Sequence, residues 1–431
     1  MYRKNSLSAH FFLQTYLLFG VYLRPSTAMT QKRYVFLILI LGSLTALGPF
    51  SIDMYLPGFK AIAQDLNTTE GKVAWSLSSY FIGISAGQLL YGPLLDRFGR
   101  KKPLYVGLLV YILASIACVF VNDIDSFIFI RFIQAVGSCA AGVASITLVR
   151  DLFPIEQNAK VFALLMLVLG ASPMVAPTLG GYVSFAFGWH AIFIVLTGLG
   201  ILTLIASWLW LPSGSKPDTS MSLKPRPIVS NFITVLKVPQ FYTYALTGAL
   251  AFAGLFVYVG ASPVLFMSVF EVEERTYGWI FAGLSVGFIG SSQINTLMLR
   301  KFTSQQLIYA ALIVQTVTVF AFLLGSMNGW FGLGGTLVML FIFLSCLGFS
   351  NPNAAALSMA PFTKNAGSAS ALMGAFQMAI GSIASAFIGF FVQDTAVPMV
   401  SIMAVTTLLA LGILHFGRKV IGKKTKEPDL I

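Results

Sequence analysis

Apolar runs of about twenty residues recur along the whole chain, and this feature limits the folds that are open to it. The first run, Tyr34–Phe50, contains no charged residue. A helix needs about 20 predominantly apolar residues to cross the hydrocarbon core of a bilayer. Only 10% of the 431 residues are charged, whereas soluble domains average about 25%. The sequence therefore predicts an all-α membrane protein that crosses the bilayer many times.

The apolar runs fall into two groups of six. The longest polar gap, residues 212–240, is rich in Pro, Ser and Lys and predicts a linker between an N-terminal half at 34–211 and a C-terminal half at 241–416. Two halves with the same number of helices are typical of secondary transporters. We expect twelve membrane-spanning helices, at about residues 34–57, 73–92, 103–121, 127–149, 160–187, 191–211, 241–268, 277–298, 306–325, 331–359, 367–392 and 397–416.

The basic residues predict how these helices are oriented. One side of the predicted membrane collects 23 of the 27 lysines and arginines, whereas the loops on the other side hold three basic and eight acidic residues. Because Lys and Arg accumulate in cytoplasmic loops, we expect the N-terminal segment 1–33, the linker and the basic tail 417–431 to be cytoplasmic. The net charge of +12 then reflects topology, and we expect lipid around the chain and no nucleic-acid partner.

The first 28 residues do not match this pattern. Their apolar stretch "FFLQTYLLFGVYL" (11–23) is too short to span a bilayer and has arginine on both sides. We expect translation to start at Met29, just before the first predicted helix. An interfacial helix and a cleaved signal peptide are the alternatives.

One acid and one base lie inside the predicted spans. Asp53 ends the first apolar run in "SIDMYLP" (51–57), and Arg131 lies early in the fourth. Counting 1.5 Å per residue from the neighbouring loops places both side chains about 10 Å below the outer surface. An ionisable residue within a membrane span usually has a functional partner. The sequence therefore predicts that Asp53 and Arg131 form a coupled pair that takes up and releases a proton. The alternatives are a helix cap for Asp53 and an outward-reaching anchor for Arg131.

Polar side chains recur at helical spacing on the second, fourth and eleventh predicted spans. Such faces point toward a cavity or toward neighbouring helices, and their small residues also allow close helix packing. We expect the face of the fourth span, which contains Arg131, to line a cavity. In the tenth span, "SNPNAAA" (350–356) predicts a broken helical turn around its proline. The candidate substrate-binding residues are Tyr55, Tyr80, Gln88, Gln134 and Gln377.

The turn between the second and third predicted spans, "YGPLLDRFGRKKP" (91–103), has an unusual charge pattern. Gly99 permits a tight turn. Asp96 lies at the C-terminal end of a helix, where the helix dipole disfavours a carboxylate. A nearby arginine or the N-terminus of another helix must therefore stabilise Asp96.

These residues resemble the signature loop of the major facilitator superfamily, which they match at Gly92, Asp96, Arg97, Gly99, Arg100 and Lys101. Arg131, Gln134 and Gly137 resemble that superfamily's fourth-span motif, with Ala135 where glycine is usual. "LVLGASPMVAPTLGG" (167–181) is similar to the fifth-span motif of its antiporters, and "SIDMYLP" with "WHAIF" (189–193) to the Bcr/CflA group of bacterial drug-resistance antiporters. The resemblance covers residues 29 to about 420.

The resemblance implies a proton-driven exporter of small drugs, such as bicyclomycin, phenicols and sulfonamides, that works in the bacterial inner membrane as a monomer. It also implies that the signature loop, with Asp151, forms a cytoplasmic conformational switch, in which Asp96 lies against the N-terminus of the eleventh span. The fifth-span motif would seal one half against the other through its Gly and Pro residues, which are Gly170, Pro173, Pro177, Gly180 and Gly181.

Other functional classes lack support in the sequence. The chain has no nucleotide-binding P-loop, no histidine cluster and no nucleophile motif within the spans. Its three cysteines all lie in apolar runs and match no zinc spacing. We therefore expect neither an enzyme nor a channel, and neither a cofactor nor a metal, with the proton gradient as the energy source. A proton-coupled importer or exporter of a small metabolite on the same fold remains the alternative.

Overall fold

The computed structural model describes residues 31–214, 217, 225–362, 366–391 and 395–424, and within them it contains helices and no strand. The prediction for the first 28 residues and the end of the tail at 425–431 lie outside this part. Twelve of the described helices have 19 residues or more, and each coincides with a predicted span: α2 (Gln31–Asp53), α4 (Glu70–Phe98), α5 (Lys101–Val119), α6 (Ile124–Leu152), α7 (Ile155–Phe187), α8 (Trp189–Trp210), α10 (Pro239–Pro263), α11 (Glu274–Met298), α12 (Ser304–Met327), α13 (Leu333–Met359), α14 (Ala366–Ile388) and α15 (Val397–Lys424).

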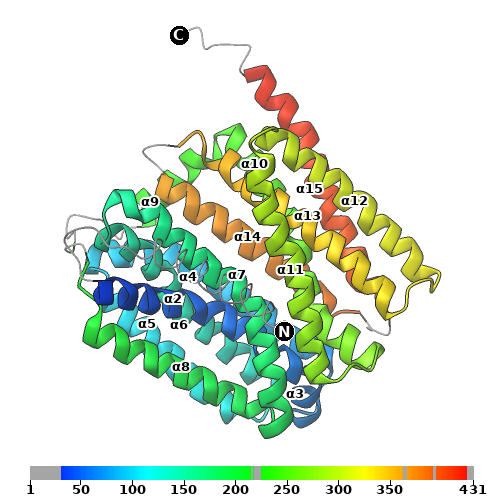
Figure 1. Cartoon of the computed structure of the whole chain (residues 1–431), viewed down its shortest axis with the longest axis horizontal. Helices are drawn as coiled ribbons and strands as arrows, with labels where there is room; N and C mark the ends of the chain where they lie inside the picture. The colour runs from blue at the N-terminus through cyan, green and yellow to red at the C-terminus, as the bar shows by residue number, and fades with distance from the viewer. Residues whose placement is uncertain (1–30, 215–216, 218–224, 363–365, 392–394, 425–431) are drawn as a thin grey trace, which may run out of the picture.

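The twelve helices form two six-helix halves, as predicted. Helices α2 and α4–α8 pack on one another, and so do α10–α15. Figure 1 shows the first group, blue to green, below and to the left of the second group, which is yellow-green to red. The two groups meet mainly along two helix pairs, α4 with α14 and α7 with α11.

Ten of the described helices are long and apolar enough to cross a membrane. The two long helices that fall short of this hydropathy, α4 and α11, both contact the opposite half. Ser and Gly interrupt both sequences, and in α4 they lie on the polar face that was predicted for the second span. A helix whose polar face is covered by protein does not need the hydropathy of a lipid-exposed helix.

Three local details differ from the sequence prediction. The first span ends at Asp53 and not at residue 57, and a short turn leads into a 3-10 helix, η1 (Leu56–Gly58), and then α3 (Phe59–Asp65). The linker contains a helix, α9 (Pro225–Leu236), whose Val235 is buried with residues of α10 and α14. The tenth span is not broken, because α13 continues through Pro352.

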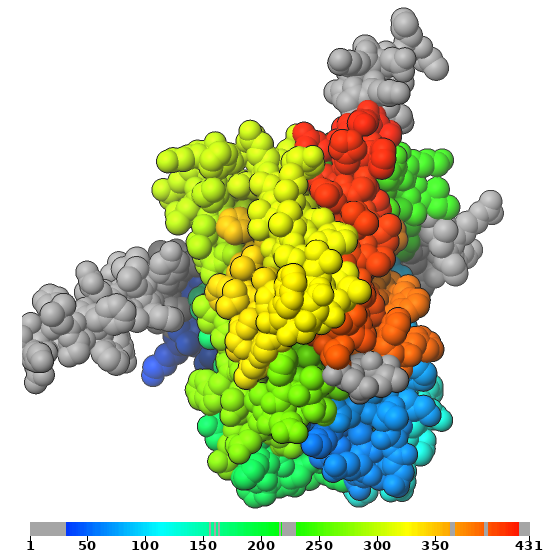
Figure 2. Space-filling view, turned by 90° about the vertical axis from the view of Figure 1, so that its right-hand side faces the viewer, coloured from blue at the N-terminus to red at the C-terminus, as the bar shows by residue number. Residues whose placement is uncertain are grey.

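The ends of the bundle are named here by the charges that they carry. The basic end holds the α4–α5 turn and the linker, and the acidic end holds α3 and the starts of α4 and α11. At the acidic end one hydrophobic cluster continues from one half into the other, and the rings of Phe81 and Phe256 lie 4.4 Å apart within it. Toward the basic end the hydrophobic clusters of the two halves are separate. Figure 2 shows the two halves stacked, with the yellow-to-red helices above the blue N-terminal residues.

Hydrogen bonds between the halves also concentrate toward the acidic end. Ser268 donates to both carboxylate oxygens of Glu70, at 2.7 and 2.9 Å. Along the α4–α14 pair, Trp75 donates to the carbonyl oxygen of Ala386 at 3.1 Å, and Ser382 donates to that of Ser78 at 2.7 Å. The structure is therefore closed between the halves at its acidic end.

Candidate functional site

Asp53 is the last residue of α2, and it is only 5% exposed. The helix ends here because the following Tyr-Leu-Pro-Gly segment turns into η1, whose proline lies in its first turn. Tyr258 on α10 and Tyr277 on α11, both of the C-terminal half, lie near its carboxylate. Asp53 therefore belongs to the N-terminal half but lies against the C-terminal half.

The Asp53 carboxylate has neither an ion-pair nor a hydrogen-bond partner in the described part of the chain. A helix C-terminus also disfavours a negative charge. Burying an unpaired carboxylate is costly, and binding a proton removes that cost. Asp53 is therefore a buried carboxylate whose charged form nothing in the described part of the chain compensates.

Arg131 on α6 is completely buried inside the N-terminal half. Its guanidinium donates to the carbonyl oxygen of Ser51 at 2.8 Å and to Gln134 Oε1 at 2.5 Å. It also lies over the rings of Tyr55 and Tyr80, 4.2 and 4.4 Å from their centroids. The ring faces and the two acceptor oxygens replace the water that this cation loses on burial.

The predicted direct pairing of Asp53 with Arg131 is absent, because no ion pair of 4.0 Å or less joins them in the described chain. Depth alone suggested the pairing, but the contacts of Arg131 lie elsewhere. Arg131 binds Ser51 and Gln134 within the N-terminal half, whereas Tyr258 and Tyr277 of the C-terminal half lie near Asp53. Arg131 instead contacts the last turn of α2, two residues before Asp53.

The five candidate substrate residues separate into two groups. Tyr55 and Tyr80 are completely buried and hydrogen-bond to Ser76 and Ser138, and Gln134 is buried between Arg131 and Ser115. These three pack around Arg131, so the expectation that the fourth-span face lines a cavity is not met. Gln88, by contrast, lies against Gly374 of α14, where the two halves face each other. Gln377 lies next to a pocket.

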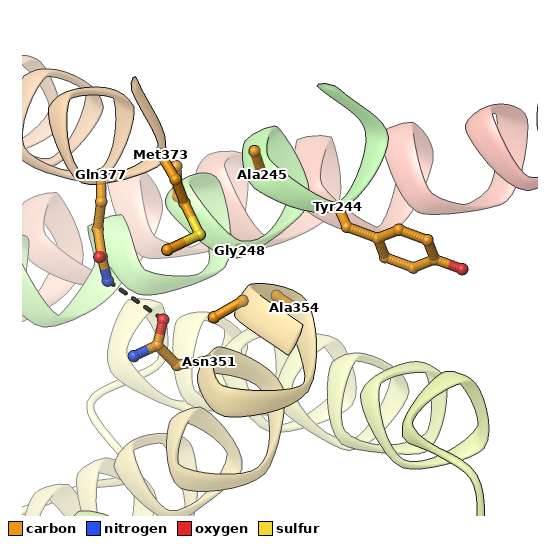
Figure 3. A pocket seen from close by; sticks show the side chains of 9 residues that line it. Tyr244, Ala245, Gly248, Asn351, Ala354, Met373 and Gln377 are labelled. Atoms are coloured by element: carbon orange, nitrogen blue, oxygen red, sulfur yellow. Dashed lines mark hydrogen bonds between the residues drawn. The ribbon is translucent and has the colours of Figure 1, made fainter. Parts of the chain in front are cut away.

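A pocket of about 130 Å³ lies in the C-terminal half, nearer the basic end. Its lining comes from α10, α13 and α14, and it carries no formally charged side chain: Tyr244, Ala245, Gly248, Ala249, Asn351, Ala354, Ala355, Met373 and Gln377. In Figure 3 the amides of Gln377 and Asn351 point toward each other, and a hydrogen bond of 3.2 Å joins them. The ring of Tyr244 points away from them.

The Gly and Pro residues of the fifth-span motif all lie on α7, which contacts α11 of the other half. A Cβ atom at Gly180 would lie 1.9 Å from the carbonyl oxygen of Met54, and one at Gly181 would lie 2.6 Å from that of Glu274. At Gly170 a Cβ would make only an ordinary contact with Ile289. Pro173 and Pro177 lie inside α7 without ending it. The motif therefore gives α7 close backbone contacts with Met54 of its own half and with Glu274 of the C-terminal half.

At the basic end, Arg100 joins two carboxylates of the N-terminal half. It donates to Asp96 at 2.5 Å and to Asp151 Oδ2 at 2.8 Å. Although partial burial acts to lower it, Asp151 and Asp96 hold the pKa of Arg100 above its usual value. The backbone turns at Gly99, whose φ of +81° favours glycine. Lys101 begins α5, and a Cβ at Gly92 would meet open space.

The sequence profile of the Major Facilitator Superfamily matches residues 41–386. The chain belongs to the major facilitator superfamily. It is therefore a membrane transporter of small molecules and not an enzyme.

Several relatives within the superfamily match this chain over almost their whole length. A "Bicyclomycin resistance protein homolog" of Haemophilus influenzae is 31% identical over 390 residues, which cover 90% of this chain and 98% of the relative. An uncharacterised transporter of Bacillus subtilis is 33% identical, covering 90% and 96%. A "Chloramphenicol resistance protein" of Pseudomonas aeruginosa is 27% identical, covering 91% and 93%.

Solved transporter structures have the same fold. A D-xylose–proton symporter superposes with a TM-score of 0.70 at 14% identity, covering 88% of this chain and 98% of that one. An inward-facing bacterial homologue of the lysosomal transporter Spinster superposes with a TM-score of 0.68 at 13% identity, covering 90% and 96%. At these identities the likeness supports the major facilitator fold and nothing finer.

Residues that complete the site came only from the tertiary structure. Tyr258 and Tyr277 face Asp53 from the other half, and no local pattern marks them. Asn351 lies in the sequence stretch that was interpreted as a broken turn. A paired asparagine motif in an apolar helix is a signal for a buried polar contact, and here its first member binds Gln377 beside the pocket.

Proposed function

We propose that this transporter is a proton-coupled antiporter that exports small drugs across the bacterial inner membrane. Bicyclomycin-, phenicol- and sulfonamide-like compounds are the proposed substrates. Membership of the superfamily and the drug-resistance names of several relatives support this proposal. The excess of basic residues at one end supports placing that end, with both termini, in the cytoplasm. The chain is proposed to act as a monomer.

The position of Asp53 is the observation that carries proton coupling. It is a buried carboxylate without a partner at the point where the halves meet. When the halves separate at the acidic end, water can reach it and the charged form is no longer penalised. When they close, the neutral form is favoured. A residue of this kind binds one proton in one conformation and releases it in another.

Arg131 has a positioning role in this proposal. Its bond to the Ser51 carbonyl oxygen joins α6 to the last turn of α2. A shift of α6 relative to α2 therefore moves Asp53 relative to the tyrosines of the other half. Arg131 therefore acts on Asp53 through the position of the last turn of α2.

In the proposed cycle we assign this structure to the inward-facing state. The halves are held together at the acidic end, and the uncharged pocket lies nearer the basic end. A drug that enters from the cytoplasm would meet Asn351, Met373 and Gln377, which offer hydrogen-bonding and apolar contacts without a formal charge. The alternating-access mechanism requires the two halves then to rock against each other, so that the bound drug is exposed to the outer side.

The proposal can be tested on purified protein. Adding chloramphenicol to the protein in weakly buffered detergent solution should release protons, and Asp53→Asn should abolish this release. Asp65→Asn, at an acid whose side chain is 53% exposed, is the matched control and should release protons like the parent. Full proton release from Asp53→Asn would overturn the assignment.

The direction of transport separates export from the metabolite alternative. In vesicles with a known orientation, an imposed proton gradient should move the drug opposite to the protons. Movement of drug and protons in the same direction would identify a symporter and overturn the antiport proposal. Movement of a small metabolite but of none of the three drug classes would overturn the proposed substrates.

A further inference from the structure

Glu274 lies where α7 of one half meets α11 of the other, at the acidic end. It is the first residue of α11. Gly181 of α7 packs against its carbonyl oxygen so closely that a Cβ at Gly181 would lie 2.6 Å away. The preceding residue, Gly180, packs against Met54, the neighbour of Asp53. Gly180 thus contacts the backbone of the residue that follows Asp53, and Gly181 contacts the backbone of Glu274 itself.

The side chain of Glu274 is half-buried in this contact, and its Oε2 atom is shielded from solvent. Ser184 of α7 lies beside the carboxylate and is only 6% exposed. Neither the Ser184 hydroxyl nor Glu274 Oε2 has a hydrogen-bond partner in the described part of the chain. Glu273, one residue earlier, is exposed. The structure therefore places Glu274 in the interface between the halves and leaves the adjacent Glu273 exposed to solvent.

The protonation state of Glu274 must depend on whether this interface is closed. Shielding from water penalises the charged form of the carboxylate, whereas the neighbouring Ser184 hydroxyl, which can donate to a carboxylate oxygen, offsets part of that penalty. The N-terminus of α11 also favours the charged form. Separation of α7 and α11 returns the carboxylate to water and restores the charged form. Closure and proton binding are therefore linked.

Other titratable and charged groups surround this position. On the packed elements these are Asp53 at the end of α2, Tyr182 on α7, Tyr258 on α10, and Arg275 and Tyr277 on α11. Arg275 points to the aromatic rings of α7, 3.9 Å from the Phe185 centroid, and it forms no ion pair of 4.0 Å or less with Glu274. Glu274 and Asp53 are thus the two carboxylates beside the α7–α11 contact, whereas Glu70 binds Ser268 at another part of the interface between the halves.

We propose that Glu274 is a second proton-binding residue of the transport cycle, one that controls closure of the acidic end. It binds a proton from the outer solution as α7 and α11 close, and it returns that proton to the same solution as they open. Its proton therefore does not cross the membrane and does not add to the number of protons exchanged for each drug. The proposal rests on the orientation given under the proposed function, whereas its test does not require transport.

The test measures the distance between spin labels at the acidic ends of α7 and α11. Phe187→Cys and Trp279→Cys are suitable sites, because these side chains are 78% and 62% exposed. The background carries replacements of the three buried cysteines and Asp53→Asn, so that Asp53 cannot contribute. With Glu274 present, we expect the ratio of closed to open molecules to fall by up to about tenfold per pH unit as the pH rises.

Two substitutions decide the result. Glu274→Gln keeps the size of the side chain, is always neutral and can donate to Ser184, so it should stay closed at every pH. Glu273→Gln should behave like the Glu274-containing parent. The same pH response in Glu274→Gln and in the parent, or no response in a folded parent, would overturn the proposal.

A transport measurement separates this proposal from the proposed function. Drug-induced proton release depends on Asp53, so Glu274→Gln in an otherwise native chain should release the same number of protons per drug. Its transport rate should depend less steeply on outer pH than that of the parent, because only Asp53 then responds to that pH. Loss of proton release in Glu274→Gln would show that Glu274 is itself a coupling residue and would overturn the proposal. If the parent itself released no protons, the proposed function would be overturned, whereas the result of the label-distance measurement would still stand.

Discussion

The guanidinium of Arg131 donates a hydrogen bond of 2.8 Å to the main-chain carbonyl oxygen of Ser51. This bond joins the buried cation of α6 to the last turn of α2, two residues before Asp53. The embedded acid and the embedded base of the N-terminal half are thus connected through the backbone and not through an ion pair. Changes at Arg131 are expected to act on Asp53 by moving it.

Removing Arg131 should destabilise the N-terminal half. Arg131→Ala leaves the Ser51 carbonyl oxygen and Gln134 Oε1 without their donor, and an unsatisfied buried group costs about 1–3 kcal/mol. We expect the melting temperature in detergent to fall. Arg131→Lys retains the charge but not the planar fork, so it should restore stability only in part. A melting temperature equal to that of the parent in Arg131→Ala would contradict this role.

The two glycines near the acidic end of α7 should be far less tolerant of a side chain than Gly170. Gly180→Ala would place a methyl group against the Met54 backbone and force the helix to move, at a cost of about 1–3 kcal/mol. Gly198→Ala on α8 is the control, because a Cβ there meets nothing within 4 Å. Thermal unfolding of both variants and of Gly170→Ala checks the order. Equal stability of all three would show that α7 does not depend on this contact.

The polar groups of the pocket should contribute to drug affinity. Gln377→Leu removes the amide that bonds Asn351 but keeps an apolar side chain of similar size. One lost hydrogen bond should raise the KM for an uncharged drug such as chloramphenicol about five- to tenfold, with a smaller effect on maximal rate. Gln293→Leu, at an exposed position of α11, should leave the KM unchanged. An unchanged KM in Gln377→Leu would place drug binding elsewhere.

The charge cluster at the basic end should bias the conformational equilibrium. In the structure Asp96 is bound by Arg100 and has a side chain that is 42% exposed. We predict that in the opposite state Asp96 lies against the N-terminus of α14, where a helix dipole would favour it. Asp96→Asn should therefore favour the conformation described here and slow turnover. Distances between labels on the basic ends of α4 and α14 measure this, and an unchanged distribution would exclude Asp96 as the switch.

The sequence by itself determined the number of membrane helices and the two-half fold. Spans of about twenty apolar residues have few alternatives in a bilayer, where every backbone polar group must be bonded within the segment. The twelve long helices therefore coincide with the predicted spans, apart from the early end of α2 at Asp53 and the uninterrupted α13. The sequence also identified Asp53 and Arg131, because charge in an apolar run is costly wherever the side chain points.

Only the tertiary structure decided which way the side chains point. Helical spacing defines a face but not the helix that covers it, so Tyr55, Tyr80 and Gln134 were grouped with cavity residues although they pack around Arg131. For the same reason Asp53 and Arg131, placed at one depth, turned out to have different neighbours. Glu274 and Tyr277 gained their importance from α7 and α2, which are about a hundred residues or more distant in sequence. Contacts between helices depend on rotation and packing, and local sequence encodes neither.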